Sequence, residues 1–161
     1  MALELRPAVR ADVVAIAAMQ KASLLETYEP FLGRAAIEEF IEAGRVEDYF
    51  EQHWRDATIS ISGGDVVGVA VLVDGLLDLI WVRPRSRSQG IGSALLRAAE
   101  SKAAVGSDEL TLEVWDVNRR AVAFYEREGF SVTATSEEPQ TGLAKLVMRK
   151  ALRAPRARPR S

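Results

Sequence analysis

The chain has 161 residues, 48% hydrophobic and 27% charged, with a formal net charge of −2; this composition excludes a disordered or fibrous protein and favours one soluble globular domain. It contains no cysteine and a single histidine, which excludes disulfides, cysteine nucleophiles and thiolate ligands, and no metal site is predicted. Neither a run of about 20 apolar residues nor an apolar leader is visible, so we expect a cytoplasmic protein without a membrane span.

The first part of the chain predicts one strand and then helices. LELRPAV has strand character, and Asp12 is placed to cap a helix in DVVAIAAMQKAS, whose apolar residues recur at helical spacing. Pro30 and Gly33 break this pattern in LLETYEPFLG. A second helical region is expected from residue 34 to about residue 54, interrupted near Gly44.

The middle of the chain predicts three hairpin-connected strands and a crossover. TISIS, VVGVAVLV and LLDLIWV are separated by glycine-bearing turns, which indicates an antiparallel meander. Helical periodicity follows from Ile91 to about Ala104, and LTLEVW is another strand. Because a strand, a helix and a strand form a crossover unit, LLDLIWV and LTLEVW should be parallel neighbours.

The last part predicts a capped helix and two strands. Asn118 is placed to cap RRAVAFYEREG, and FSVTATS and GLAKLVMRK follow as strands. The element order predicts an α+β domain over residues 1–150, with a mixed, mostly antiparallel sheet of about six to seven strands. Residues 151–161 belong to a basic run without acidic residues and are expected to form a disordered tail. Nucleic-acid binding is not favoured, because no aromatic residues accompany this charge.

The loop RSRSQGIGS joins the strand LLDLIWV to the next helix and has the features of an anion site. The first N–H groups of a helix lack internal partners and carry the positive end of its dipole. Gly90 and Gly92 allow close approach to the backbone, and Arg85 and Arg87 add positive charge. A pyrophosphate would satisfy both features.

Two common phosphate motifs do not fit this loop. A nucleoside triphosphate loop needs a lysine and a Ser or Thr after its last glycine, whereas Ser93 and Ala94 follow Gly92. A dinucleotide fold needs a third glycine where Leu95 stands, and the preceding hairpins fit a doubly wound sheet poorly.

Two motifs resemble the signatures of one family, the GNAT superfamily of acyl-CoA-dependent N-acyltransferases. Val82-Arg83-Pro84 followed by Arg87-Ser88-Gln89-Gly90-Ile91-Gly92 is similar to R/Q-x-x-G-x-G/A. NRRAVAFYEREGF, residues 118–130, is similar to N-x-x-A-x-x-[FL]-Y-x-x-x-G-F. The element order over residues 3–150 also matches the family.

The resemblance implies an N-acetyltransferase domain over residues 1–150, with a three-layer α/β/α arrangement and a sheet splayed at its central parallel pair. It implies acetyl-CoA as the acyl donor, without a metal, and direct attack by a primary amine in a ternary complex. Homodimers are common in the family. The implied contacts with the donor are Trp81, Val82, Arg87, Ser88, Gln89, Gly90, Ile91, Gly92, Ser93, Asn118, Ala121, Phe124 and Tyr125.

The resemblance also implies catalytic residues. Tyr125 matches the family tyrosine that donates a proton to the departing thiolate, although an aromatic residue at this position also suits a buried helix face. Asp78 lies near the position of the family's general base, on the same strand face as Val82 if the strand is regular. Glu113 on the neighbouring strand is a competing candidate, and both carboxylates also suit a solvated sheet.

The acceptor site is implied to lie under the first helices, with Tyr28, Glu29 and Phe31 in its wall. The acidic body of the chain favours a cationic amine, small or protein-borne, because long-range attraction would concentrate it. A non-catalytic acyl-CoA-sensing domain is the alternative function, since it would keep the pyrophosphate loop without turnover.

Overall fold

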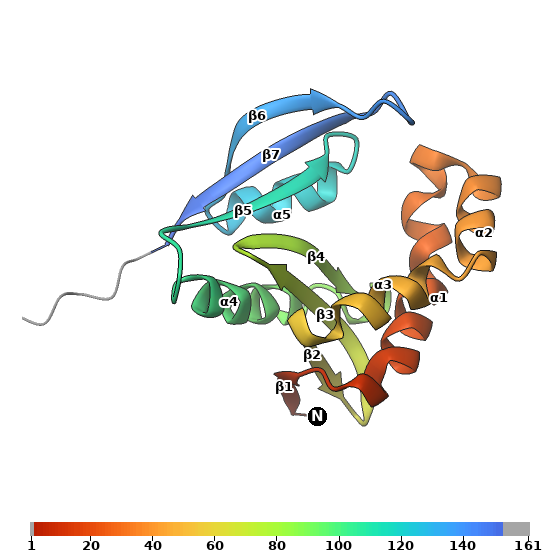
Figure 1. The fold of residues 1–161 in the computed structure, drawn as a ribbon, viewed down its shortest axis with the longest axis horizontal. Coiled ribbons are helices and arrows are strands. Elements are labelled where there is room, and N and C mark those ends of the chain that lie inside the picture. Colours follow the sequence, from red (N-terminus) through yellow and green to blue (C-terminus); the bar gives the residue numbers. More distant parts are fainter. Residues whose placement is uncertain (1, 153–161) are drawn as a thin grey trace, which may run out of the picture.

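A computed structural model describes residues 2–152, which form a seven-stranded sheet with helices on both faces (Figure 1). The sheet order is β1-β2-β3-β4-β5-β7-β6, and every neighbouring pair is antiparallel except β4 and β5. The strands are β1 (Leu3–Pro7), β2 (Ala57–Ser62), β3 (Asp65–Val73), β4 (Leu76–Val82), β5 (Glu109–Trp115), β6 (Ser131–Glu137) and β7 (Ala144–Ala151). The predicted mixed sheet with one parallel pair is confirmed.

The helices divide between the two faces of the sheet and give the three layers expected. They are α1 (Val13–Leu32), α2 (Arg34–Glu42), α3 (Arg45–His53), α4 (Ile91–Ala103) and α5 (Arg119–Arg127). The first three share one hydrophobic cluster with β2 and β3, whereas α4 and α5 share the other with β5 and β7. Within residues 2–152, no helix is both long enough and apolar enough to pass through a bilayer.

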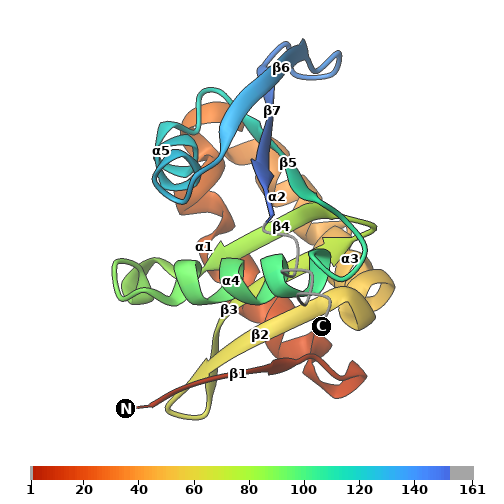
Figure 2. The same cartoon turned by 90° about the vertical axis from the view of Figure 1, so that its left-hand side faces the viewer.

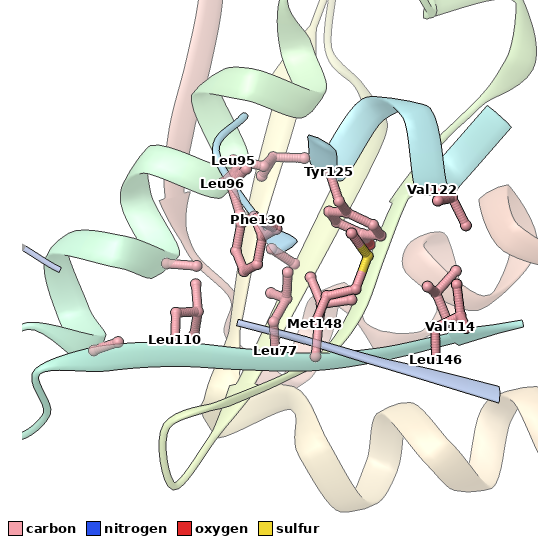
Figure 3. Packing of buried hydrophobic residues seen from close by; sticks show 14 of the residues in the cluster. Leu77, Leu95, Leu96, Leu110, Val114, Val122, Tyr125, Phe130, Leu146 and Met148 are labelled. Atoms are coloured by element: carbon pink, nitrogen blue, oxygen red, sulfur yellow. The ribbon is translucent and has the colours of Figure 1, made fainter. Parts of the chain in front are cut away.

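Large aliphatic and aromatic side chains fill the two clusters. Phe50 and Ile59 are fully buried in the first cluster, and Leu96 and Met148 in the second. Figure 3 shows the second cluster, where residues from α4, α5, β5 and β7 converge. Burying one such leucine or phenylalanine stabilises the fold by about 1.5–3 kcal/mol. The two clusters hold β4 from both sides, and the second cluster also holds β5.

The parallel pair β4 and β5 separates soon after it begins. Leu76 pairs with Thr111 and Leu77 with Leu112, and the two strands share no further pairs. Beyond that point β5 continues with β7 and β6 as an arm that rises away from β1–β4, as both views show (Figures 1 and 2). The splayed central pair is therefore confirmed.

A β-bulge lies in β4 where the strands separate. Leu77 pairs with Leu72 and Leu79 with Val71, so Asp78 is an extra residue without a partner on β3. An extra residue shifts the alternation of side chains by one position. Leu77, rather than Asp78, therefore packs with Val82 on the α4 face of the sheet.

Helix α1 is longer than the sequence predicts. It continues through Pro30 and ends at Leu32, where Gly33 donates its N–H to the Glu29 carbonyl at 3.0 Å. Pro30 lies in the last turn, so its ring removes a single hydrogen bond of the helix instead of breaking its middle. The interruption near Gly44 is confirmed: Gly44 has φ 73° and separates α2 from α3.

The prediction that Asp12 caps α1 is wrong. A short 3₁₀ turn over Arg10–Asp12 precedes the helix, so Asp12 already has helical dihedrals. Its carboxylate instead accepts the Val9 N–H at 2.7 Å and two bonds from the Arg6 guanidinium at 2.8 and 2.9 Å. The Arg6 hydrogen bonds lower the pKa of Asp12. The tail prediction falls on residues 151–161; Ala151 ends β7, and residues 153–161 lie outside the described part.

Candidate active site

A cleft of about 570 Å³ opens where β4 and β5 separate. Its walls come from β4, β5, α5, the C-terminal half of α1 and the loop before α4. Its lining includes Thr27, Tyr28, Asp78, Trp81, Val82, Arg87, Ser88, Gly90, Gly92, Ser93, Glu113, Trp115, Asn118, Arg120, Ala121, Phe124, Tyr125, Arg127, Glu128 and Lys145. Most of the residues predicted from the sequence are thus brought together in one cleft.

The end of β4 turns peptide groups toward the cleft. Val82 pairs with Gly68, and the flanking hydrogen bond runs from the Arg83 N–H to the Val67 carbonyl at 3.0 Å. In an antiparallel ladder such a bond flanks a non-hydrogen-bonded pair, in which each residue directs its N–H and C=O groups away from the partner strand. The Val82 N–H therefore faces the gap that β5 leaves, whereas the alternation turns the Trp81 peptide groups toward β3.

The loop before α4 presents backbone amides at the mouth of the cleft. Ser88 and Gly90 have positive φ values of 64° and 81°, and α4 begins at Ile91 without a side-chain cap. Gly90 therefore needs the conformational freedom of glycine. Ser88, Gly90, Gly92 and Ser93 line the cleft, whereas Ile91 is buried in the core and Gln89 is not in the lining.

Gly92 has a packing role that the sequence does not reveal. A Cβ atom at Gly92 would lie 3.3 Å from Cζ of Phe124 on α5. The missing side chain therefore lets α4 and α5 approach each other beneath the cleft.

The Arg87 side chain lines the cleft and makes hydrogen bonds within the protein. Its Nε donates to the Val82 carbonyl at 3.0 Å, and its guanidinium reaches the Thr27 hydroxyl at 3.5 Å. Burial, together with the nearby Arg120, lowers the pKa of Arg87. Arg87 thus ties α1 to the end of β4.

Helix α5 adds positive charge to the cleft. Arg120 and Arg127 line the cleft, whereas Arg119 pairs with Asp116 at 2.5 Å. The Glu128 carboxylate adds a negative charge to the cleft. Its Oε1 accepts a hydrogen bond from the Ser93 hydroxyl at 2.5 Å in the first turn of α4.

Tyr125 belongs both to the core and to the cleft. Its side chain is 8% exposed and packs against Phe124 and Phe130, with ring centroids 5.4 and 5.7 Å away (Figure 3). It also lines the cleft. Burial raises the pKa of Tyr125, so the phenol stays protonated at neutral pH and can donate a proton.

The two candidate bases follow the last paired positions of β4 and β5. Asp78 lines the cleft and accepts a hydrogen bond from the Tyr49 hydroxyl at 2.5 Å, and Glu113 lies 3.5 Å from the Lys145 ammonium. The prediction that Asp78 shares a face with Val82 is wrong, because the bulge turns Asp78 toward α3. Both carboxylates are exposed to solvent.

Of the three residues predicted for the acceptor wall, Tyr28 alone lines the cleft. Its ring packs against Trp81 at 5.6 Å and Trp115 at 5.4 Å, and burial raises its pKa. Glu29 instead pairs with Arg34 at 3.4 Å. Phe31 is half-buried outside the cleft lining.

Asn118 acts as the predicted helix cap. Its Oδ1 accepts the Ala121 N–H at 3.3 Å at the start of α5. Asn118, Ala121 and Phe124 also line the cleft.

Several residues at the cleft are absent from the sequence prediction. They are Thr27, Trp115, Arg127, Glu128 and Lys145, and Tyr49 is a further unpredicted residue that contacts the cleft residue Asp78 without lining the cleft. Trp115 ends the strand that runs parallel to β4, so its place beside the gap could have been inferred from the topology. The contact between Tyr49 and Asp78 joins segments 29 residues apart and has no local signal.

The chain belongs to the GNAT acetyltransferase family, because the family model described as "Acetyltransferase (GNAT) domain" matches residues 51–132, about half of the chain. Among curated relatives, the peptidyl-lysine N-acetyltransferase YjaB of Escherichia coli is 37% identical over 76 residues, which are 47% of this chain and 49% of YjaB. Blasticidin-S acetyltransferase of Streptomyces morookaense is 32% identical over 81 residues, 47% of this chain and 56% of that protein. The chain therefore spans about half the length of the curated relatives it matches.

Solved structures match nearly the whole chain. The PaiA N-acetyltransferase of Thermoplasma acidophilum, in complex with coenzyme A, has a TM-score of 0.78 at 20% identity, over 94% of this chain and 99% of that one. Apo YjaB of E. coli has a TM-score of 0.72 at 22% identity, over 96% and 100% of the two chains. At these identities the likeness shows the fold, which confirms the fold expected from the two motifs.

Proposed function

We propose that this protein transfers an acetyl group from acetyl-CoA to a primary amine by direct attack in a ternary complex. The observation that carries the proposal is the divergence of β4 and β5 after Leu77 and Leu112, which opens a cleft between a backbone N–H and the start of a helix. Family membership and the coenzyme A complex of PaiA support the same donor.

The residues at the mouth fit the diphosphate of coenzyme A. The backbone amides of residues 89–93 stand at the positive end of α4, where an anion is favoured. Arg120 and Arg127 add cationic side chains at the same mouth. Gly90 has a left-handed backbone conformation. A Cβ atom added there would meet nothing within 4 Å, so the space next to Gly90 is open for a ligand.

The inner end of the cleft fits the thioester. The Val82 N–H faces the gap and would donate to the carbonyl oxygen as negative charge develops on it, as in an oxyanion hole. Bound acetyl-CoA supplies an activated acetyl thioester, so a base and a proton donor are the groups that the protein must add. The chain has no cysteine that could hold the acetyl group covalently.

The proton balance assigns roles to Tyr125 and Asp78. At neutral pH a lysine-like amine is an ammonium, with about one molecule in a thousand as free base. Asp78 takes one proton from it, directly or through water. The nitrogen then forms the C–N bond while the C–S bond breaks, and Tyr125 protonates the departing sulfur and regains a proton from the acylated nitrogen. The products are an amide, a thiol and one proton.

The acceptor end of the cleft fits a cationic amine. Asp78 carries a negative charge there, whereas the charge of Glu113 is offset by Lys145. Tyr28 and Trp115 provide aromatic walls for an aliphatic chain. Glu113 as the base, a cytoplasmic location, homodimer formation and the absence of nucleic-acid binding stay predictions.

The test is a screen of primary amines monitored by thiol release from acetyl-CoA, with a reaction lacking amine as the control. Acceptor-dependent thiol release, with the acetylated amine identified by mass spectrometry, is the expected result. Binding of acetyl-CoA without thiol release for any amine or lysine peptide would instead support the acyl-CoA-sensing alternative.

A further inference from the structure

Tyr49 of α3 contacts Asp78, the proposed base, from outside the cleft lining. Its hydroxyl donates to Oδ2 of Asp78 at 2.5 Å, across 29 residues of sequence. Among residues 2–152 it is the one side-chain group that hydrogen-bonds Asp78. Because a tyrosine has few rotatable bonds, such a contact fixes the position of a carboxylate better than water does.

The Tyr49 ring is itself held firmly. It packs edge-on against the fully buried Phe50, with centroids 5.1 Å apart, and lies 4.7 Å from the His53 ring. His53 in turn lies 3.6 Å from Asp56. Burial and the neighbouring Asp78 carboxylate raise the pKa of Tyr49, so the phenol keeps its proton and remains a donor.

A base must point its carboxylate at the acceptor nitrogen, but regular strand pairing does not fix the orientation of the Asp78 side chain. It is the bulged residue of β4, and it follows the last position at which β4 and β5 pair. The side chain is exposed, so without a partner it would sample several rotamers in water. The Tyr49 hydroxyl occupies Oδ2, which leaves Oδ1 for a proton from the acceptor.

We propose that Tyr49 is a positioning residue that holds the Asp78 carboxylate with Oδ1 directed at the acceptor nitrogen. This inference depends on the proposed function, because it assigns Asp78 as the base. Tyr49 neither gains nor loses a proton in the step: the acceptor ammonium loses one, and Oδ1 of Asp78 takes it. Of the other carboxylates nearby, Glu113 pairs with Lys145, and Asp56 lies 3.6 Å from the His53 ring.

The contact can be tested without turnover by NMR of the full chain labelled with ¹³C at tyrosine Cζ. Three tyrosines give three signals, and Tyr49→Phe identifies one of them. Asp78→Asn should move the Tyr49 signal and leave that of Tyr125 in place. A Tyr49 signal that does not respond to Asp78→Asn overturns the inference.

The positioning role can be tested with two acceptors of different basicity. Tyr49→Phe should lower kcat/KM by about tenfold for a strongly basic amine, the size of one hydrogen bond to a charged group. It should have little effect for a weakly basic alkoxyamine, which is unprotonated at neutral pH and needs no base before attack. Asp78→Asn should show the same selectivity, and the double variant should be no slower than Asp78→Asn alone.

Glu47→Gln is the matched control for a loosened α3. It removes the ion pair between Lys21 of α1 and Glu47 of α3, which anchors the same helix without touching Asp78. This variant should treat both amines as the native chain does. Equal losses for both amines in Tyr49→Phe, or additive losses in the double variant, would overturn the positioning role.

The two proposals fail in different ways. If none of the amines causes the native chain to release thiol, the proposed function is contradicted, and the positioning role with it. A native chain that acetylates the strongly basic amine while Tyr49→Phe keeps full kcat/KM contradicts the positioning role alone.

Discussion

Tyr125 is part of both the hydrophobic core and the cleft. Its ring packs in the core, and its hydroxyl is the group proposed to act in catalysis. Tyr125→Phe keeps the ring that packs against Phe124 and Phe130. Because it removes only the proton donor, we expect kcat to fall by about 100-fold, the lower end for general acid catalysis. Affinity for coenzyme A, measured by calorimetry, should stay the same. An unchanged kcat would leave Tyr125 a core residue.

Glu128 places a carboxylate where an anion is expected to bind. Its Oε1 accepts from the Ser93 hydroxyl at 2.5 Å, close to the amides that would hold the diphosphate. Removing this charge should tighten coenzyme A binding about two- to fivefold, an effect that salt screens. Glu128→Gln is compared by calorimetry with Glu126→Gln, an exposed residue of α5 outside the cleft lining. Equal affinities in both variants would contradict this placement of the diphosphate.

Sequence reasoning located the chemistry of single residues better than their orientation. Tyr125, Gly90 and Asn118 lie at the cleft as expected because two local motifs contain them. The orientation of Asp78 could not be foreseen, since a bulge leaves no mark in an apolar strand. Arg87 lines the cleft as expected, but no local signal foretells its contact with the Val82 carbonyl.

The start of α4 is the element on which the donor site depends. Gly90→Ala would force a non-glycine residue into φ 81°, which costs about 1–2 kcal/mol of stability. Gly90→Asp adds no more strain than Gly90→Ala, because an aspartate adopts this conformation more readily than an alanine, and it also places a carboxylate in the expected diphosphate site. We therefore expect Gly90→Asp to be destabilised no more than Gly90→Ala in denaturant unfolding, whereas it binds coenzyme A much more weakly. Equal affinities in the two variants would remove the loop from the donor site.

The elements themselves were largely predictable, and the exceptions have clear causes. Hairpin turns and changes of hydrophobic period gave β2, β3, β4, α4 and β5 close to their observed bounds. The sequence predicts α1 too short, because a proline usually ends or kinks a helix; here Pro30 lies in the last turn, and the helix continues through it to Leu32. The packing of Tyr28 against Trp81 and Trp115 holds that turn, and it joins segments far apart in sequence.

At the scale of the whole molecule, the cleft divides a sheet whose two parts are joined by few strand pairs. A ligand that fills the cleft should therefore stabilise the entire fold. At 100 times its dissociation constant a ligand contributes about 2.7 kcal/mol, which should raise the melting temperature by about 5–10 °C. Differential scanning fluorimetry with coenzyme A measures this shift, and Gly90→Asp should reduce it. No shift at saturating coenzyme A would contradict a site in this cleft.

The parallel crossover through α4 followed from chain order alone, because such connections have few alternatives. The insertion of β7 between β5 and β6 could not be predicted from chain order, since nothing local in GLAKLVMRK distinguishes an inner strand from an edge strand.

The early parting of β4 and β5 leaves an interior strand edge whose main-chain groups no neighbouring strand pairs. Such edges normally lie at the rim of a sheet, where they template the addition of foreign strands and promote self-association. An extended ligand with amide groups of its own would act as a substitute strand and close that edge. The ligand-free protein should therefore aggregate sooner than the liganded protein when both are concentrated and warmed, so storage with coenzyme A should keep it monodisperse for longer.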